Sequence, residues 1–143
     1  MTEHSLWRVS RAFHRALSER QTDQLESVLD DNVDWAIYGP IDMFAFFGPR
    51  RGKRAVVDVV REISSIVTLH RSERESIMLG EDSAASMMRY SLMPEANGNP
   101  ISVRVALFVQ FKAGRLSSLR AVIDTFDLVE QTLGRQIHLP KIA

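Results

Sequence analysis

Ile101–Lys112 (ISVRVALFVQFK) and Leu116–Phe126 (LSSLRAVIDTF) are the two stretches that decide the fold. Every odd position of the first stretch is apolar, which predicts a strand with one buried face. Ala113-Gly114 between them predicts a tight turn, because glycine tolerates the positive φ that hairpin turns need. We therefore expect the two stretches to pair as neighbouring strands of a sheet.

The second stretch carries a carboxylate in an unusual place. Counting alternate positions from Leu116 puts Asp124 on the same face as large apolar residues. A carboxylate in such surroundings loses hydration, which raises its pKa and suits a general acid or base near neutral pH. We expect Asp124 to lie in an apolar pocket as the catalytic residue, beside a wall made of Val103, Val105, Val122 and Phe126.

A structural role for Asp124 stays open at this point. As a strand-end carboxylate, it would bind backbone or pair with Arg89, Arg104 or Arg120. Its catalytic partner depends on the register of the neighbouring strand, Ala84–Met93. An ungapped register brings Tyr90 to the site, where its hydroxyl would donate to a developing enolate oxygen, and a shift by one residue brings Arg89 instead.

Three helices are expected in the first half of the chain. Apolar residues at spacings of three and four predict a helix over Glu3–Ser18, a second short helix after Thr22, and a third that begins at Gly52. Val33–Tyr38 between them reads as a strand. The loop Ile41–Phe47 is strongly apolar for a loop, so we expect its phenylalanines to cover the pocket or to contact a partner subunit.

The second half is expected to consist of strands and one short helix. Thr68–Leu79 and Ala84–Met93 precede the two stretches quoted above, and Asp127 with Glu130 is typical of a capping box for a helix that ends at Leu133. Helices followed by a strand meander predict a single α+β domain over residues 1–143, with a curled antiparallel or mixed sheet packed on the three helices. Such a cone encloses a pocket, whose further lining we expect from Trp35, Tyr38, Met88 and Leu92.

Composition narrows the setting of the protein without naming its chemistry. The formal net charge is zero, which argues against nucleic-acid or membrane-surface binding. There are no cysteines, so disulfides and thiolate metal sites are excluded. The four histidines show no metal-ligand spacing, and no apolar run spans a bilayer. We expect a cytoplasmic protein with no metal and no cofactor.

Several short motifs carry a family resemblance across most of the chain. They are Asp31-Asn32-Val33 leading to Trp35, the glycines Gly39, Gly48 and Gly52, and Ile123–Phe126 at the end of the last strand. The chain resembles the nuclear-transport-factor-2-like superfamily, specifically the SnoaL-like and ketosteroid-isomerase-related proteins. The resemblance implies a conical barrel and a homodimer packed sheet to sheet. It also implies that Asp124 matches the last-strand aspartate of the polyketide cyclases and epoxide hydrolases.

The resemblance leaves two classes of function open. The first is cofactor-free acid–base chemistry on a small hydrophobic molecule, of the isomerase, polyketide cyclase or dehydratase type, carried by Asp124 and Tyr90. The second is a non-catalytic module that binds such a ligand or serves as a structural dimer. For the dimer we expect the face of the last strand opposite Asp124, with Leu119, Ala121 and Ile123, to be an exposed apolar patch.

Overall fold

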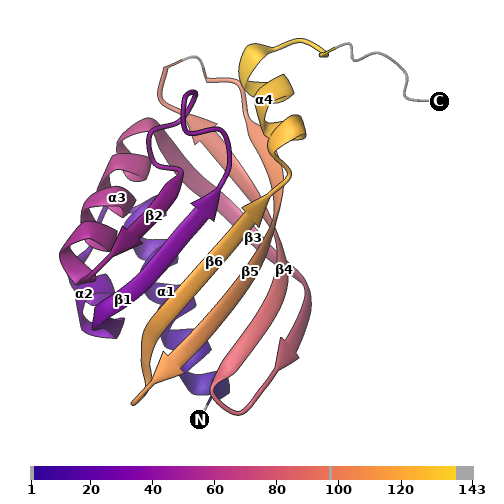
Figure 1. Ribbon diagram of the computed structural model, residues 1–143. Coiled ribbons are helices and arrows are strands. Elements are labelled where there is room, and N and C mark those ends of the chain that lie inside the picture. The colour runs from indigo at the N-terminus through magenta and orange to yellow at the C-terminus, as the bar shows by residue number, and fades with distance from the viewer. Residues whose placement is uncertain (1, 97, 138–143) are drawn as a thin grey trace.

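The computed structural model describes residues 2–96 and 98–137, and they form four helices and six strands (Figure 1). In chain order these are α1 (Thr2–Ser18), α2 (Asp23–Val28), β1 (Leu29–Tyr38), β2 (Gly48–Arg51), α3 (Lys53–Ile66), β3 (Val67–Leu79), β4 (Ser83–Pro94), β5 (Ile101–Lys112), β6 (Arg115–Ile123) and α4 (Thr125–Leu133). The expected α+β fold class is confirmed. Strand β2 is an addition that sequence patterns did not indicate.

One mixed, curled sheet contains all six strands, in the order β2-β1-β6-β5-β4-β3. Strand β1 runs parallel to β6, and every other neighbouring pair is antiparallel. The sheet does not close: in the described part of the chain β2 and β3 remain its two edges. The expected barrel is therefore an open cone.

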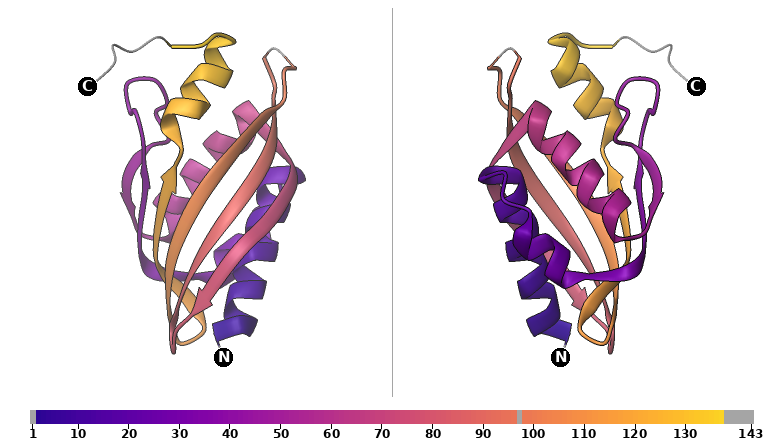
Figure 2. Two further views of the ribbon diagram at one scale, coloured as in Figure 1. Left: turned by 90° about the vertical axis from the view of Figure 1, so that its right-hand side faces the viewer. Right: turned by 90° about the vertical axis from the view of Figure 1, so that its left-hand side faces the viewer.

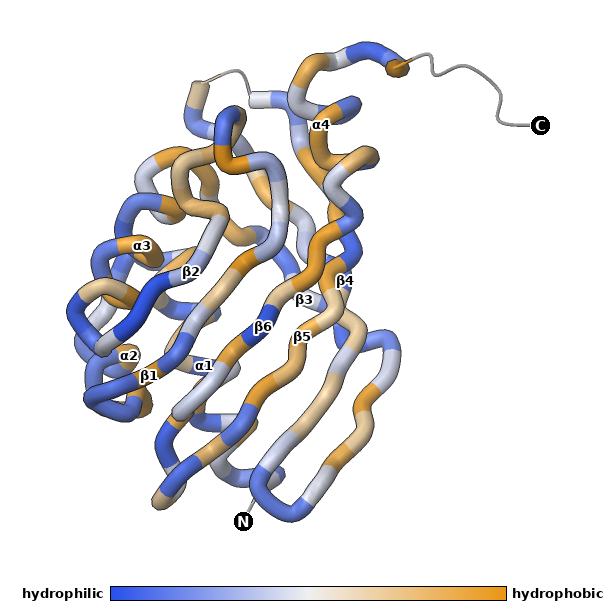
Figure 3. The backbone as a smooth tube through the Cα atoms, viewed as in Figure 1, coloured by the Kyte–Doolittle hydropathy of each residue, from blue (hydrophilic) through white to orange (hydrophobic). Residues whose placement is uncertain are grey.

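Helices α1, α2 and α3 all lie on one side of this sheet (Figure 2). Helix α1 buries Leu6, Val9, Ala12 and Ala16, whose spacing of three and four residues puts them on one face of a helix. Helix α3 does the same with Val56 and Val60. Apolar side chains of the central strands β5 and β6 oppose them. In Figure 3 hydrophobic segments of these two strands alternate with hydrophilic ones, whereas edge strand β2 is mostly hydrophilic.

A β-bulge near the start of β6 reverses the face of its side chains. Gln110 of β5 pairs with Ser118, whereas the next residue, Phe111, pairs with Leu116, so Ser117 is an extra residue on β6. One extra residue sends all later side chains to the opposite face. Leu116, Leu119 and Ala121 are accordingly all buried. The alternation that we counted from Leu116 is therefore wrong beyond Ser117, and Val122 and Asp124 lie on the outer face.

The last strand is also shorter than its sequence indicated. Strand β6 ends at Ile123, and helix α4 begins at Thr125, so Phe126 belongs to the helix. The N-cap is Asp124 and not Asp127, since the Asp124 side chain accepts the hydrogen bond of the first turn. Within residues 2–96 and 98–137, no helix is long and apolar enough to cross a membrane.

Candidate functional site

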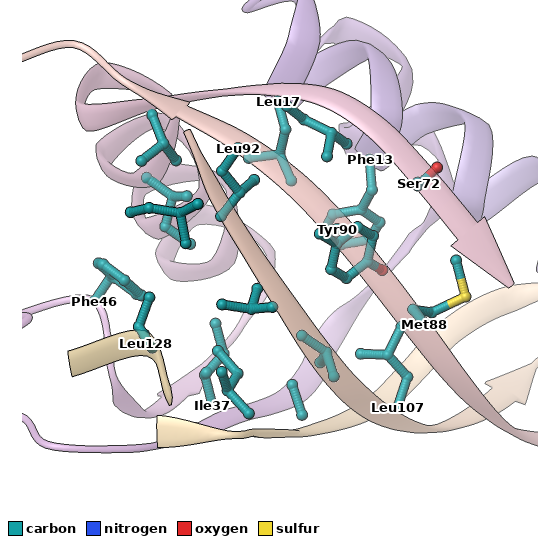
Figure 4. Close-up of a pocket in the computed structure, with 18 of the residues that line it drawn as sticks. Phe13, Leu17, Ile37, Phe46, Ser72, Met88, Tyr90, Leu92, Leu107 and Leu128 are labelled. Atoms are coloured by element: carbon teal, nitrogen blue, oxygen red, sulfur yellow. The ribbon is translucent and has the colours of Figure 1, made fainter. Parts of the chain in front are cut away.

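A cavity of about 730 Å³ lies between the helices and the concave face of the sheet. Its size falls in the range of small-molecule pockets, roughly 300–1,000 Å³. Six of the residues that we expected at a pocket line this cavity, namely Trp35, Met88, Tyr90, Leu92, Val103 and Val105. Figure 4 shows Met88, Tyr90 and Leu92 in this cavity, together with Phe13, Leu17 and Leu107.

Four other expected residues lie outside the cavity. Tyr38, Val122 and Phe126 are 52%, 46% and 43% exposed. Asp124 is exposed as well. The bulge at Ser117 explains why Val122 and Asp124 lie outside the cavity, because it turns both side chains to the outer face. In their place, Leu119, Ala121 and Ile123 form the part of the cavity wall that β6 supplies. The face that we expected to be an exposed patch is thus the inner one.

Tyr90 and Asp124 are not brought together. The register pairs Tyr90 with Val103 and with Ser72, and its side chain lines the cavity. Arg89 points elsewhere and donates to the Ser102 hydroxyl at 3.0 Å. The ungapped register was expected to bring Tyr90 to Asp124, but Tyr90 faces the cavity whereas Asp124 is exposed on the outer face. The two residues lie on opposite sides of the sheet, so Asp124 has no place in an acid–base pair with Tyr90.

Aromatic side chains form the floor of the cavity. Trp35 is only 4% exposed, and its ring stacks on Phe13 with the centroids 5.5 Å apart. The loop after β1 folds over the cavity as expected, because Phe44 and Phe46 line it. Phe47, which is 1% exposed, packs behind them with its ring centroid 4.7 Å from that of Phe46. The three phenylalanines of the loop thus pack in or against the core, whereas Ile41 and Met43 are exposed.

Helix α4 closes the cavity at the end where Leu128 and Gln131 line it. The Gln131 amide is bound to the backbone of Ser102 in β5 by two hydrogen bonds of 2.8 Å, one donated and one accepted. A paired amide contact of this kind fixes the orientation of the helix on the sheet. The Asp124 cap therefore serves the cavity indirectly, by starting this helix.

Acid–base groups are scarce in the cavity. Among the described residues no carboxylate lines it, and the titratable side chains that do are His14, Arg74 and Tyr90. Burial raises the pKa of Tyr90 to about 12, while the positive charge of Arg74 acts in the opposite direction. Tyr90 is therefore a hydrogen-bond donor at neutral pH. Within the described chain there is also no cluster of three or more side chains that could hold a metal ion.

Sequence reasoning missed Ser72 and Arg74, which line the cavity from edge strand β3. They lie in the stretch HRSERES, where polar residues occupy both faces of the strand, so alternation gives no indication of the inner side. The signal that would have found them is their cross-strand pairing with Tyr90 and Met88 of β4. That pairing depends on a bulge in β3 between Leu69 and Arg71.

Comparisons with known proteins agree with this architecture. A family model described as a SnoaL-like domain matches residues 10–119. The crystal structure of a candidate isomerase from Rhodopseudomonas palustris shares 66% sequence identity and superposes with a TM-score of 0.91, covering 94% of this chain and 100% of that one. A search of curated proteins finds no significant match.

More distant structures share the fold alone. A candidate isomerase from Bacillus subtilis has 14% identity and a TM-score of 0.79, over 96% of this chain and 99% of that one. An epoxide hydrolase of the LEH-like type from M. tuberculosis has 18% identity and a TM-score of 0.68, over 92% of this chain and 91% of that one.

Proposed function

This chain belongs to the SnoaL-like domain family, and we propose that it binds a small hydrophobic molecule in the cavity between its helices and its sheet. The observation that carries the proposal is a cavity of about 730 Å³ with a mainly apolar lining. Water in such a space makes few hydrogen bonds, so an apolar ligand that displaces it gains free energy. No cofactor is part of the proposal.

Tryptophan fluorescence gives a direct test. The chain has two tryptophans. Trp35 lines the cavity, while Trp7 is 56% exposed outside it. In a Trp7→Phe background, Trp35 is therefore the only reporter. We expect decan-1-ol to change its emission in a saturable way, and the absence of any change would contradict the proposal.

A cavity-filling variant shows where the ligand binds. Ala121 is buried in the cavity wall, so Ala121→Phe projects a ring into the ligand space and should strongly weaken decan-1-ol binding. Ala45→Phe is the matched control, because Ala45 is exposed and does not line the cavity. Equal binding by both variants would place the ligand elsewhere.

Isomerase activity is the second candidate, because the 66% identical protein is described as a candidate isomerase. Proton transfer inside this cavity would rely on His14 as the base and Tyr90 as the donor to an enolate oxygen, since Asp124 faces outward. Exchange of the α-protons of a hydrophobic ketone in D₂O, followed by NMR, tests this. Isomerase activity is supported if the unaltered protein catalyses the exchange and both His14→Gln and Tyr90→Phe lose it. If the unaltered protein catalyses no exchange, ligand binding remains as the one proposed function.

A further inference from the structure

Four of the polar residues that line the cavity come from one pair of strands, while Ser10, His14, Asn99, Gln131 and Thr132 line it from other parts of the chain. Ser72 and Arg74 come from β3, and Ser86 and Tyr90 from the adjacent strand β4. Ser72 pairs directly with Tyr90, and Arg74 with Met88. Figure 4 shows the Tyr90 hydroxyl turned toward the end where Ser72 and Met88 lie. The cavity thus has a polar end on the β3–β4 hairpin, while most of its remaining wall is hydrocarbon.

Arg74 is a cation without an ion-pair partner in the described part of the chain. Its two neighbours in sequence are carboxylates, but each is bound to another arginine. Glu73 lies 2.7 Å from Arg71, and Glu75 binds Arg104 through two hydrogen bonds of 2.8 and 3.0 Å. No carboxylate among the described residues lines the cavity to neutralise Arg74 from within. The guanidinium is therefore free to receive an anion at the cavity edge.

Tyr90 supplies a second donor at the same end. Its hydroxyl makes no hydrogen bond to any residue that the structure describes, although its ring is packed among core side chains. Because burial raises its pKa to about 12, the hydroxyl keeps its proton at neutral pH and can donate a hydrogen bond to an acceptor. Arg74 lies two residues along β3 from Ser72, the cross-strand partner of Tyr90, and its positive charge opposes the rise of the Tyr90 pKa.

We propose that the ligand of this cavity is amphipathic, with a carboxylate bound by Arg74 and Tyr90 and a hydrocarbon body that lies along the apolar walls. The inference rests on the proposed function and adds the chemical class of the ligand. A guanidinium offers parallel N–H donors that match a carboxylate in a bidentate pair. Ser72 and Ser86 add hydroxyl donors, and no lining carboxylate repels the anion.

Matched ligands separate the head group from the hydrocarbon chain. In the Trp7→Phe background, we compare decanoate with decan-1-ol by titration of Trp35 fluorescence at neutral pH, where decanoate is ionised. Decanoate should bind about tenfold more tightly than the alcohol, as expected when one charge-assisted pair is added. Arg74→Gln should remove this preference while leaving decan-1-ol binding unchanged. Tyr90→Phe should reduce it in part.

Arg115→Gln is the control for net charge, because Arg115 is exposed, lies outside the cavity and loses the same single charge. It should keep the full preference for decanoate. Equal binding of the two ligands, or a preference that survives Arg74→Gln, would overturn the carboxylate inference and leave the proposed function standing. If neither ligand alters Trp35 emission, the proposed function fails and this inference fails with it.

Discussion

The carboxylate of Asp124 accepts a hydrogen bond of 3.3 Å from the backbone N–H of Asp127. The first backbone N–H groups of a helix have no partner within the helix, so a side chain that accepts from one of them stabilises the helix start. Asp124 is this N-cap for α4. At the other end of the helix, the backbone N–H of C-cap Gly134 donates to the carbonyl oxygens of Glu130 and Gln131.

The capping role predicts how two substitutions differ. Asp124→Ala removes the acceptor and should lower the free energy of unfolding by ~1 kcal/mol. Asp124→Asn keeps an acceptor oxygen, and because asparagine caps helices about as well as aspartate, the change should be small. Thermal unfolding of the two variants checks this. A loss for the Asn variant as large as that for the Ala variant would mean that the charge, not the cap, stabilises the native state.

Two periodicities made most of the fold predictable. Period-2 alternation in β5 places Ile101, Val103 and Val105 on one buried face, as the structure confirms. Apolar residues spaced three and four apart predicted helices α1 and α3 and their buried faces. Strand β2 was not predicted because its four residues, GPRR, show no alternation of apolar and polar side chains.

The candidate site was only partly predictable, and the bulge in β6 is the main physical reason. Alternation carries information along a strand only while the pairing stays regular, and the extra residue Ser117 breaks it. The residues of β4 and β5 that we expected in the pocket, which precede the bulge, do line the cavity, whereas the faces of Val122 and Asp124, which follow it, were reversed. Arg74 could not be placed because its strand is polar on both faces.

Gly39 should tolerate no side chain. A Cβ atom built on it would lie 2.7 Å from the ring of Phe47, which is 1% exposed and packed in the core. Gly39→Ala should therefore cost ~1–3 kcal/mol of stability, as overpacking does. Urea unfolding measures this cost. The double variant with Phe47→Leu should recover part of it, and strict additivity would show that the ring is not the cause.

Tyr90 should ionise far above the usual range. Its folded-state pKa of about 12 exceeds the unfolded value of about 10, so its contribution to stability is intact below pH 10 and is lost as the pH rises toward 12. Tyr38→Phe leaves Tyr90 as the only tyrosine, since the chain has two. Phenolate absorbance should then appear only near pH 12 or on alkaline unfolding. Phenolate at pH 10 in protein that circular dichroism shows to be folded would contradict this.

Asp34 should contribute to stability in the opposite pH range. Its carboxylate accepts a hydrogen bond of 2.8 Å from Arg120, and this bond is the main cause that lowers its pKa. Because the folded pKa lies below the unfolded value of about 3.9, the contribution is present above that pH and is lost as the pH falls through the folded value. Asp34→Asn should thus lower the melting temperature at pH 7 and lower it less at pH 2. Equal losses at both would point to packing instead.

The outer face of the sheet is where we propose that two copies of this chain associate. Tyr38 pairs across the strands with Val122, and Val122 pairs with Ala106, so these residues form one surface. Tyr38 and Val122 are about half exposed, as is Phe108 on the same sheet, and a monomer rarely leaves such an apolar surface in water. The homodimer expected from the sequence is therefore proposed on the face that carries Val122, opposite to the face first expected.

Light scattering tests the association directly, since one chain has a mass of 16.2 kDa. We expect about twice this mass for the unaltered protein and the single-chain mass for Phe108→Glu, because the carboxylate would be desolvated between the two sheets. Met78→Glu is the matched control: Met78 is 76% exposed on edge strand β3, away from the central strands. It should leave the mass unchanged. A single-chain mass for the unaltered protein at micromolar concentration, or a dimer that persists in Phe108→Glu, would rule out this interface.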